Sequence, residues 1–224
     1  MDATLRLFPL NTVLVPGVAL RLHIFEDRYK QMIGECIDQT APFGVLLDRN
    51  GAETGDELDP VDVGTTAEIR EVTRLPQGRL FIVTRGVRRF KTLSMVDKEP
   101  FLVGHVRYLD EPSGPTDAAQ ALRETAVERF KQYLQALLSI SGQQLERVQL
   151  PDDVVAASYL IADALQVDTQ AKQRLLESES ATDRLRDELK ILHDETQRIR
   201  AMQAVGSAAA LKKRSAFAAK FSLN

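Results

Sequence analysis

The residues of this chain that could do chemistry are few and scattered. Three histidines, His23, His105 and His193, are far apart and have no partner at the spacing of metal ligands. Cys36 is the single cysteine, and it falls on the apolar side of an expected helix, where a thiol usually packs as a small hydrophobic group. We therefore expect no catalytic residues, no metal and no cofactor.

Neither a calcium site nor an ATP site is expected from the sequence. An acidic loop could suggest calcium, but its spacing and glycine position differ from those of an EF-hand, so we expect a solvated loop. Its carboxylates are Glu53, Asp56, Glu57, Asp59 and Asp62. An ATP site of the form Gly-x-x-x-x-Gly-Lys-Ser/Thr is not present in these 224 residues, which contain no Gly-Lys pair.

The sequence therefore favours a binding function, and one candidate surface for polypeptide lies beside the first expected helix. A helix at residues 26–39 follows a β-hairpin, and a groove between helix and sheet is one place where a polypeptide can lie. Arg28, Tyr29 and Met32 would be near such a groove. The alternative is that Tyr29 and Met32 are ordinary core residues, which their place on the apolar face of the helix also predicts.

A second basic group lies on an expected strand. Arg85, Arg88 and Arg89 could form a patch for acidic peptides, or could lie on a solvated strand face and pair with Glu68 or Glu71 across the sheet. The residues that we predict to bind peptide are Arg28, Tyr29, Met32, Arg85 and Arg88.

The first 112 residues predict the β-rich part that positions these side chains. Short apolar runs alternate with turn residues and give six or seven strands and one helix, with a tight hairpin turn at residues 76–78. The opening reads as strand, turn, strand and helix, and residues 80–83 and 87–95 read as separate strands interrupted by Gly86. Antiparallel neighbours joined by short turns predict a barrel-like or coiled antiparallel sheet.

The remainder of the chain is predicted to be helical. Residues 113–204 contain four apolar stripes of helical period, with Thr116, Asp168 and Ser180 as expected N-caps, and end in a long helix. Residues 205–224 are a basic, alanine-rich tail, for which we expect a frayed end or a helix docked on its own domain rather than a membrane helix. The predicted fold class is thus α+β, with a β subdomain at 1–112 and a helical subdomain at 113–204.

Several of these motifs resemble the Lon N-terminal domain family, the substrate-recognition module of the ATP-dependent protease Lon. They are Phe-Pro-Leu at 8–10, Val-Pro-Gly at 15–17, Leu-His-Ile-Phe-Glu-Asp-Arg-Tyr at 22–29, Asp-Val-Gly-Thr at 62–65, Arg-Gly-Val-Arg-Arg-Phe at 85–90 and Lys-Gln-Arg-Leu-Leu-Glu at 172–177. The resemblance covers roughly residues 5–200. It implies a stand-alone recognition module without the ATPase and protease domains.

Composition and charge restrict the expected partners and cellular compartment. A net charge of −3 points to neither nucleic acid nor an anionic membrane as partner, and no apolar run approaches the roughly 20 residues of a membrane span. One cysteine allows no internal disulfide, and no signal peptide is expected, so we expect a cytoplasmic protein.

Three functional hypotheses follow. The favoured one is a non-catalytic adaptor or holdase that binds unfolded or tagged polypeptide, alone or with a Lon-type protease. The second is a small-ligand-binding or enzymatic module with a pocket between the subdomains. The third is a structural oligomer that self-associates through the last helix.

Overall fold

The structure is a computed structural model that describes residues 2–50, 58–114, 116–145 and 147–204. The tail at 205–224 and the loop acids Glu53, Asp56 and Glu57 lie outside the described residues. By contacts between Cα atoms the chain divides into two compact units. The first contains the described residues of Met1–Asp110 and Val167–Glu177, and the second those of Glu111–Gln166 and Ser178–Asn224.

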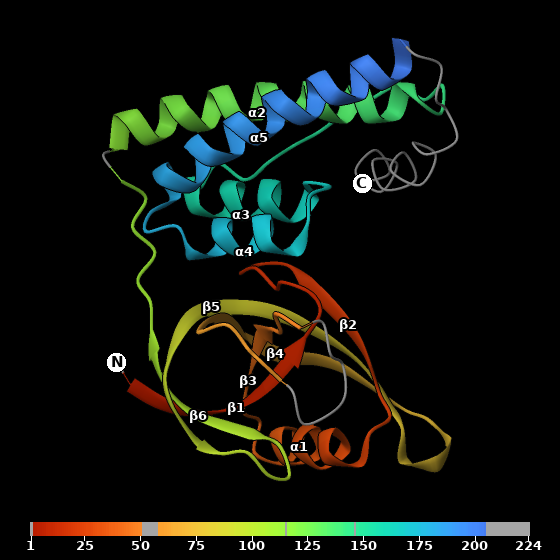
Figure 1. Ribbon diagram of the computed structural model, residues 1–224, viewed down its shortest axis with the longest axis vertical. Coiled ribbons are helices and arrows are strands. Elements are labelled where there is room, and N and C mark those ends of the chain that lie inside the picture. Colours follow the sequence, from red (N-terminus) through yellow and green to blue (C-terminus); the bar gives the residue numbers. More distant parts are fainter. Residues whose placement is uncertain (1, 51–57, 115, 146, 205–224) are drawn as a thin grey trace. The chain divides into compact units, whose positions relative to one another are not determined.

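The first unit is built on a six-stranded sheet (Figure 1). Its strands are β1 (Asp2–Leu10), β2 (Ala19–Ile24), β3 (Phe43–Leu47), β4 (Val63–Arg74), β5 (Leu80–Asp97) and β6 (Leu102–Tyr108). The strand order is β2-β5-β4-β3-β1-β6, and β5 also pairs with β6. Five strands therefore close into a barrel, and β2 is added to it by pairing with β5 alone. The α+β fold class and the barrel-like sheet predicted from the sequence are confirmed.

One prediction about strand direction is wrong. β1 and β3 run parallel, with Leu7 opposite Gly44 and Leu10 opposite Leu47, whereas every other pair is antiparallel. The crossover that a parallel pair requires is supplied by β2 and by helix α1 (Asp27–Asp38). The apolar residues at 13–15 are buried but do not belong to a strand.

Strand β5 is a single strand of 18 residues and not the two that Gly86 seemed to separate. The close approach of another part of the backbone explains the glycine, because a Cβ at Gly86 would lie 2.4 Å from the carbonyl oxygen of Val15. The register between β4 and β5 shifts beside it, where Thr65 lies opposite Arg89 and Ala67 opposite Gly86. The irregular register beside Gly86 is a β-bulge, and the strand continues through it.

The larger of the two apolar core clusters of the first unit lies between the sheet and α1, and the other is formed by strand residues alone. The helix buries Tyr29, Met32, Ile33 and Cys36, which are spaced three or four residues apart. The Tyr29 ring stacks on Phe8 of β1 with 4.1 Å between ring centroids. Each fully buried side chain of this size stabilises the fold by about 1.5–3 kcal/mol, so α1 and the sheet stabilise each other.

Helix α4 (Thr169–Glu177) belongs to the first unit although it lies far along the sequence. Two buried side chains hold it. The Arg89 guanidinium, 2% exposed, donates to the carbonyl oxygens of Leu176 (2.7 Å) and Asp110 (3.0 Å). The Gln173 amide donates to the carbonyl oxygen of Val63 at 2.9 Å. Arg89 is thus a structural residue, and the surface patch suggested for it is wrong.

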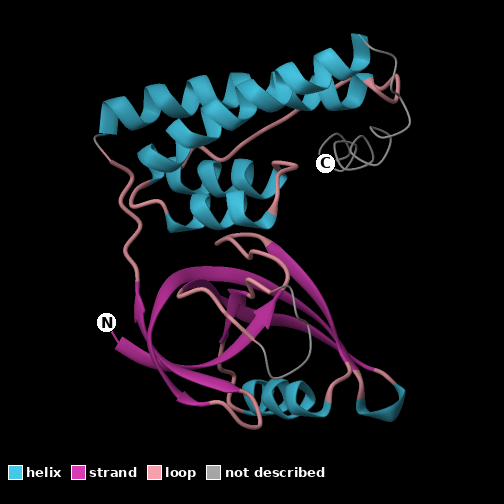
Figure 2. Ribbon diagram, viewed as in Figure 1, coloured by secondary structure: helices cyan, strands magenta, loops and turns pink. Residues whose placement is uncertain are grey.

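The second unit is helical (Figure 2). It contains α2 (Thr116–Ser139), α3 (Val154–Ala164) and α5 (Ala181–Ala204), and α2 and α5 run side by side in Figure 1. The Asp153 carboxylate accepts from the amide of Ala156 at 2.7 Å and caps α3. The Ser180 hydroxyl accepts from the amide of Asp183 at 3.1 Å, so the N-cap predicted for the last helix is confirmed.

A buried polar cluster joins α3 and α5. The Arg184 guanidinium is fully buried, lies 3.7 Å from the centre of the Tyr159 ring, and donates to the Ser158 and Tyr159 hydroxyls at 2.8 Å each. The Tyr159 hydroxyl donates in turn to the Glu111 carboxylate at 2.7 Å. Buried charge is tolerated here because it is hydrogen-bonded.

Candidate functional site

Exposed apolar side chains mark one part of the chain. Among the described residues, all large hydrophobic side chains that are strongly exposed belong to the first unit: Phe25, Val72, Phe81, Val87, Leu93, Met95 and Val96. Phe25 is 54% exposed. The described helices of the second unit expose no such side chain. Apolar surface that stays in water is a common mark of a binding site.

Three of these residues lie on or beside a ribbon that projects from the barrel. We define the ribbon as residues 19–24 of β2, 80–85 of β5 and 68–74 of β4; its tip is the hairpin turn at Pro76–Gly78 (Figure 1). His23 lies opposite Phe81, and Phe81 lies opposite Thr73, so these three side chains share a face. Phe25 adjoins this face, because its ring centroid is 5.8 Å from that of His23.

A groove of about 440 Å³ borders the same ribbon. Its lining comes from the end of α1 and the loop after it, and from β4: Cys36, Ile37, Thr40, Ala41, Pro42, Glu68, Ile69, Arg70 and Val72. A bulge in β4 turns Ile69 and Val72 to the same side, since they lie opposite Thr84 and Ile82, two residues apart on β5. The groove between helix and sheet that the sequence suggested exists, but at the other end of the helix from Arg28.

The structure separates the predicted peptide-binding residues into two classes. Tyr29 and Met32 are 3% and 0% exposed and belong to the core, which is the alternative that the sequence left open. Arg28 is partly exposed, pairs with Glu26 at 3.0 Å and lies 4.6 Å over the Tyr29 ring. Arg85 and Arg88 are both exposed on β5.

The two exposed arginines of β5 differ in their surroundings. The Arg88 guanidinium stacks over the Tyr108 ring at 4.7 Å. Arg85 lies opposite Glu68 in the register, but Glu68 forms its ion pair with Arg70 at 2.6 Å. Among the described contacts none pairs Arg85 with a carboxylate, so its charge is available to a ligand.

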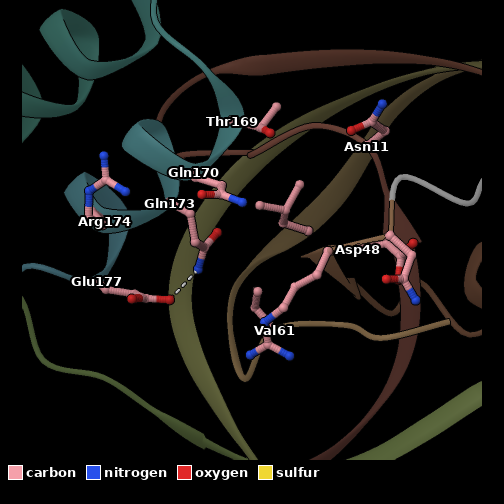
Figure 3. A pocket seen from close by; sticks show the side chains of 11 residues that line it. Asn11, Asp48, Val61, Thr169, Gln170, Gln173, Arg174 and Glu177 are labelled. Carbon is pink, nitrogen blue, oxygen red and sulfur yellow. Dashed lines mark hydrogen bonds between the residues drawn. The ribbon is translucent and has the colours of Figure 1, made fainter.

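A second, polar pocket of about 460 Å³ lies within the first unit (Figure 3). It is formed where the parallel strands β1 and β3 end, and one face of α4 covers it. The residues of the strand ends are Asn11, Leu47, Asp48, Arg49 and Asn50; α4 contributes Thr169, Gln170, Gln173, Arg174 and Glu177; and Val61 completes the lining. The carboxyl ends of parallel strands are a common place for ligands.

The polar groups of this pocket are firmly held. The amide nitrogen of Gln173 donates to Glu177 Oε1 at 2.7 Å, as Figure 3 shows. The amide oxygen of Gln173 is buried and accepts from no described group. Asp48, 2% exposed, accepts from the amide of Asp59 at 2.6 Å. The described lining combines amide, carboxylate and guanidinium side chains, which are hydrogen-bonding groups suited to hold a polar ligand.

Cys36 lines the apolar groove but is 1% exposed. Burial raises the pKa of its thiol to about 11, so the thiol stays protonated and unreactive at neutral pH. His23, His105 and His193 lie on β2, β6 and α5, and no three histidine, cysteine or acidic residues gather as a metal site in the described part of the chain. None of the described helices is long and apolar enough to cross a membrane.

The chain matches one protein family over most of its length. The model of the ATP-dependent protease La (LON) substrate-binding domain matches residues 4–194. The chain belongs to this family. Its members are referred to below as Lon substrate-binding domains.

Similar whole proteins are much longer than this chain. It is 26% identical over 202 residues to a Lon protease of Bacillus thuringiensis and 29% identical over 188 residues to one of Heliobacterium modesticaldum. These matches cover 89% and 81% of this chain but 25% and 22% of the relatives. The chain thus spans about a quarter of the length of the Lon proteases that it matches.

Solved structures show the same fold. A Lon N-terminal domain protein from Xanthomonas campestris superposes with a TM-score of 0.60 at 24% identity, covering 84% of this chain and 98% of that one. The N-terminal domain of a Mycobacterium avium complex Lon protease gives 0.61 at 19% identity, covering 87% and 98%. At these identities the likeness concerns the fold.

Sequence reasoning missed two features of the site. One is the polar pocket, which depends on the parallel pairing of β1 and β3 and on the place of α4 in the first unit. The helix itself was predicted, but neither the pairing nor its place in the first unit was. A signal was present, because Asn11 and Asp48 each directly follow an apolar strand. The other is the unpaired edge of β2, which only the strand order reveals.

Proposed function

We propose that this Lon substrate-binding domain is a non-catalytic module that binds unfolded or tagged polypeptide and acts as an adaptor or holdase. The observation that carries the proposal is that, among the described residues, strongly exposed large apolar side chains occur only in the first unit, and that Phe25, Val72 and Phe81 lie on or beside the ribbon. An unfolded chain differs from a folded one chiefly in its exposed apolar side chains and unpaired backbone. A surface with the same properties is therefore suited to bind it.

The partly exposed Arg28 and the exposed Arg85 and Arg88 complete the proposed surface. They lie on the same unit as the apolar groups, where they would steer acidic segments and not supply most of the affinity. Tyr29 and Met32 support the surface from within the core. A Lon-type protease is the partner that we propose to receive the bound polypeptide, by analogy with the family.

The test is a binding titration with a labelled, reduced and carboxymethylated client protein, followed by fluorescence anisotropy. We expect saturable binding without nucleotide, and mass spectrometry should find the client intact afterwards. Phe81→Lys places a charge on the apolar face and should weaken binding about tenfold, as loss of a central apolar contact does. Gln197→Lys, an equal change of charge at an exposed position of α5, is the matched control and should leave binding unchanged. Absence of binding, or cleavage of the client, would overturn the proposal.

The polar pocket favours a second candidate function, the binding of a small ligand. Its volume lies within the usual range of about 300–1,000 Å³ for ligand sites, and α4 holds it in shape through Arg89 and Gln173. A thermal-shift screen of polar metabolites would test this. A hit that Gln170→Ala abolishes would support it, and a screen without any hit would argue against it.

A further inference from the structure

We infer that an extended segment of the client adds to the unpaired edge of β2 as a further strand, with acidic side chains over Arg21 and apolar side chains beside Leu20 and Leu22. This inference rests on the proposed function and specifies its site.

The first step is the edge itself. β2 is the terminal strand of the sheet and pairs with β5 from Ala19–Arg85 to Ile24–Leu80 without any shift in register. No described segment pairs with its other side. A regular six-residue edge presents a row of unpaired N–H and C=O groups, which is a template for another strand.

The second step is the direction of these groups. The Gly86 amide donates to the Val18 carbonyl oxygen at 2.8 Å, and the antiparallel ladder continues from there. In such a ladder, alternate residues hydrogen-bond to the partner strand. Residues 20, 22 and 24 therefore point their backbone groups to β5, and Ala19, Arg21 and His23 point theirs outward to an added strand.

The third step compares the two edges of the ribbon. The distal part of β4 is also unpaired, because β3 reaches only Val45–Thr65, Gly44–Thr66 and Phe43–Ala67. That edge carries a bulge at Ile69–Glu71, and bulges hinder the addition of a strand. β2 lacks such an irregularity, so it is the edge that we assign to the client.

The fourth step is the charge of the occupant. Ala19, Arg21 and His23 are exposed on one face, while Leu20 and Leu22 are half-buried on the other, packed against the core. Arg85 lies opposite Ala19 and so shares the face of Arg21. Among the described residues neither arginine has an ion-pair partner, and cross-strand neighbours of opposite charge attract. The segment that fits alternates acidic and apolar residues, with apolar side chains beside Leu20 and Leu22.

The proposed client segment can also contact apolar side chains beyond the end of β2. Phe81 lies on the same face as Arg21, and the Phe25 ring adjoins this face through His23. Near the end of β2, an aromatic or aliphatic residue of the client can therefore take the place of one acidic residue. Backbone hydrogen bonds to β2 would thus supply affinity for the client, and contacts of its alternate side chains would supply specificity.

The experiment uses the full chain and a fluorescent peptide of alternating apolar and acidic residues, titrated by anisotropy. Arg21→Glu should weaken binding at least about tenfold, because like charges then face each other. Arg74→Glu makes the same charge change on the opposite edge of the ribbon, where Arg74 is also exposed, and should change binding less than about twofold.

Backbone pairing has its own test. His23→Pro removes one outward N–H without touching the bonds to β5, and N-methylation of alternate peptide residues removes the partner groups. Both should abolish binding, while circular dichroism shows an unchanged fold for the variant. A His23→Ala variant, which keeps the N–H, should retain binding and is the control for the lost imidazole.

The outcomes separate this inference from the proposed function. If the carboxymethylated client and the peptide bind equally well to the wild type, Arg21→Glu and His23→Pro, the β2 edge is not the site, although polypeptide binding stands. If neither ligand binds the wild type, the proposed function fails and this inference fails with it. Selective loss in Arg21→Glu and His23→Pro, with Arg74→Glu and His23→Ala unaffected, supports the assignment.

Discussion

The carboxyl group of Glu188 is the least satisfied group in the described structure, and its replacement should stabilise the second unit. Glu188 lies on α5, is fully buried, and neither of its carboxylate oxygens has a hydrogen-bond partner. Burial raises its pKa well above the usual value of 4.5, and the Arg184 charge one turn earlier opposes this only in part. Arg184 already donates to Ser158 and Tyr159.

The expected effect on stability has two parts. A buried polar group without a partner costs about 1–3 kcal/mol, so Glu188→Met, which keeps the length of the side chain, should raise the free energy of unfolding by about that amount even at pH 4. The midpoint of thermal unfolding rises by roughly 2–4 °C per kcal/mol in a protein of this size. The second part depends on pH, because the folded state holds the proton more tightly than the unfolded state.

The sign of the pH dependence follows from the raised pKa. Below the unfolded pKa of 4.5 both states are protonated and the group adds no pH-dependent cost. As the pH rises toward the folded pKa, only the unfolded state ionises, and stability falls by about 1.4 kcal/mol per pH unit. Glu188→Gln mimics the neutral acid, so it should match the wild type near pH 4 and exceed it increasingly up to neutral pH.

Urea unfolding of the wild type, Glu188→Gln and Glu188→Met between pH 4 and pH 8, followed by circular dichroism, measures these differences. Asp194→Asn removes an exposed carboxylate from the same helix and should shift stability by less than about 0.5 kcal/mol at every pH. A constant difference between Glu188→Gln and the wild type across this range would refute the reasoning, and so would a loss of stability in Glu188→Met.

Three further predictions concern the first unit. Arg89→Lys should lower stability by about 2–4 kcal/mol, because one ammonium group cannot reproduce the bonds of the guanidinium to both Leu176 and Asp110, and amide exchange in α4 should quicken. Gly86→Ala should destabilise by about 1–3 kcal/mol because of the Val15 carbonyl oxygen, whereas Gly34→Ala in α1, where a Cβ meets nothing within 4 Å, should be neutral or stabilising in thermal melts. Cys36 should react with iodoacetamide at pH 8 at least about a hundredfold more slowly in the folded protein than in urea, because its thiolate fraction is small.

Much of the fold could be predicted because its signals are local. The helix caps at Asp168 and Ser180 and the hairpin turn at Pro76–Gly78 depend on residues a few positions apart, and all three are present. The burial of Tyr29 and Met32 follows from the period of α1, which is why the core was already a strong alternative to their role in binding.

The features that were missed depend on contacts between distant residues. The parallel pairing of β1 with β3 and the place of α4 in the first unit connect segments whose local sequence is the same whichever way they pair. Arg89 appears in a basic run that reads as surface, yet its guanidinium is buried because the carbonyl oxygens of Asp110 and Leu176 meet it. The unpaired edge of β2 likewise follows from strand order alone.

The central claim is that the first unit binds extended polypeptide. Hydrogen exchange of the full chain with and without a saturating, carboxymethylated client tests it most directly, because every described amide reports separately on its own protection. We predict slower exchange at Ala19, Arg21 and His23 of β2 when the client is bound, no change in α2 and α5, and an intact client. Unchanged exchange throughout the first unit, or protection confined to the second, would contradict the claim.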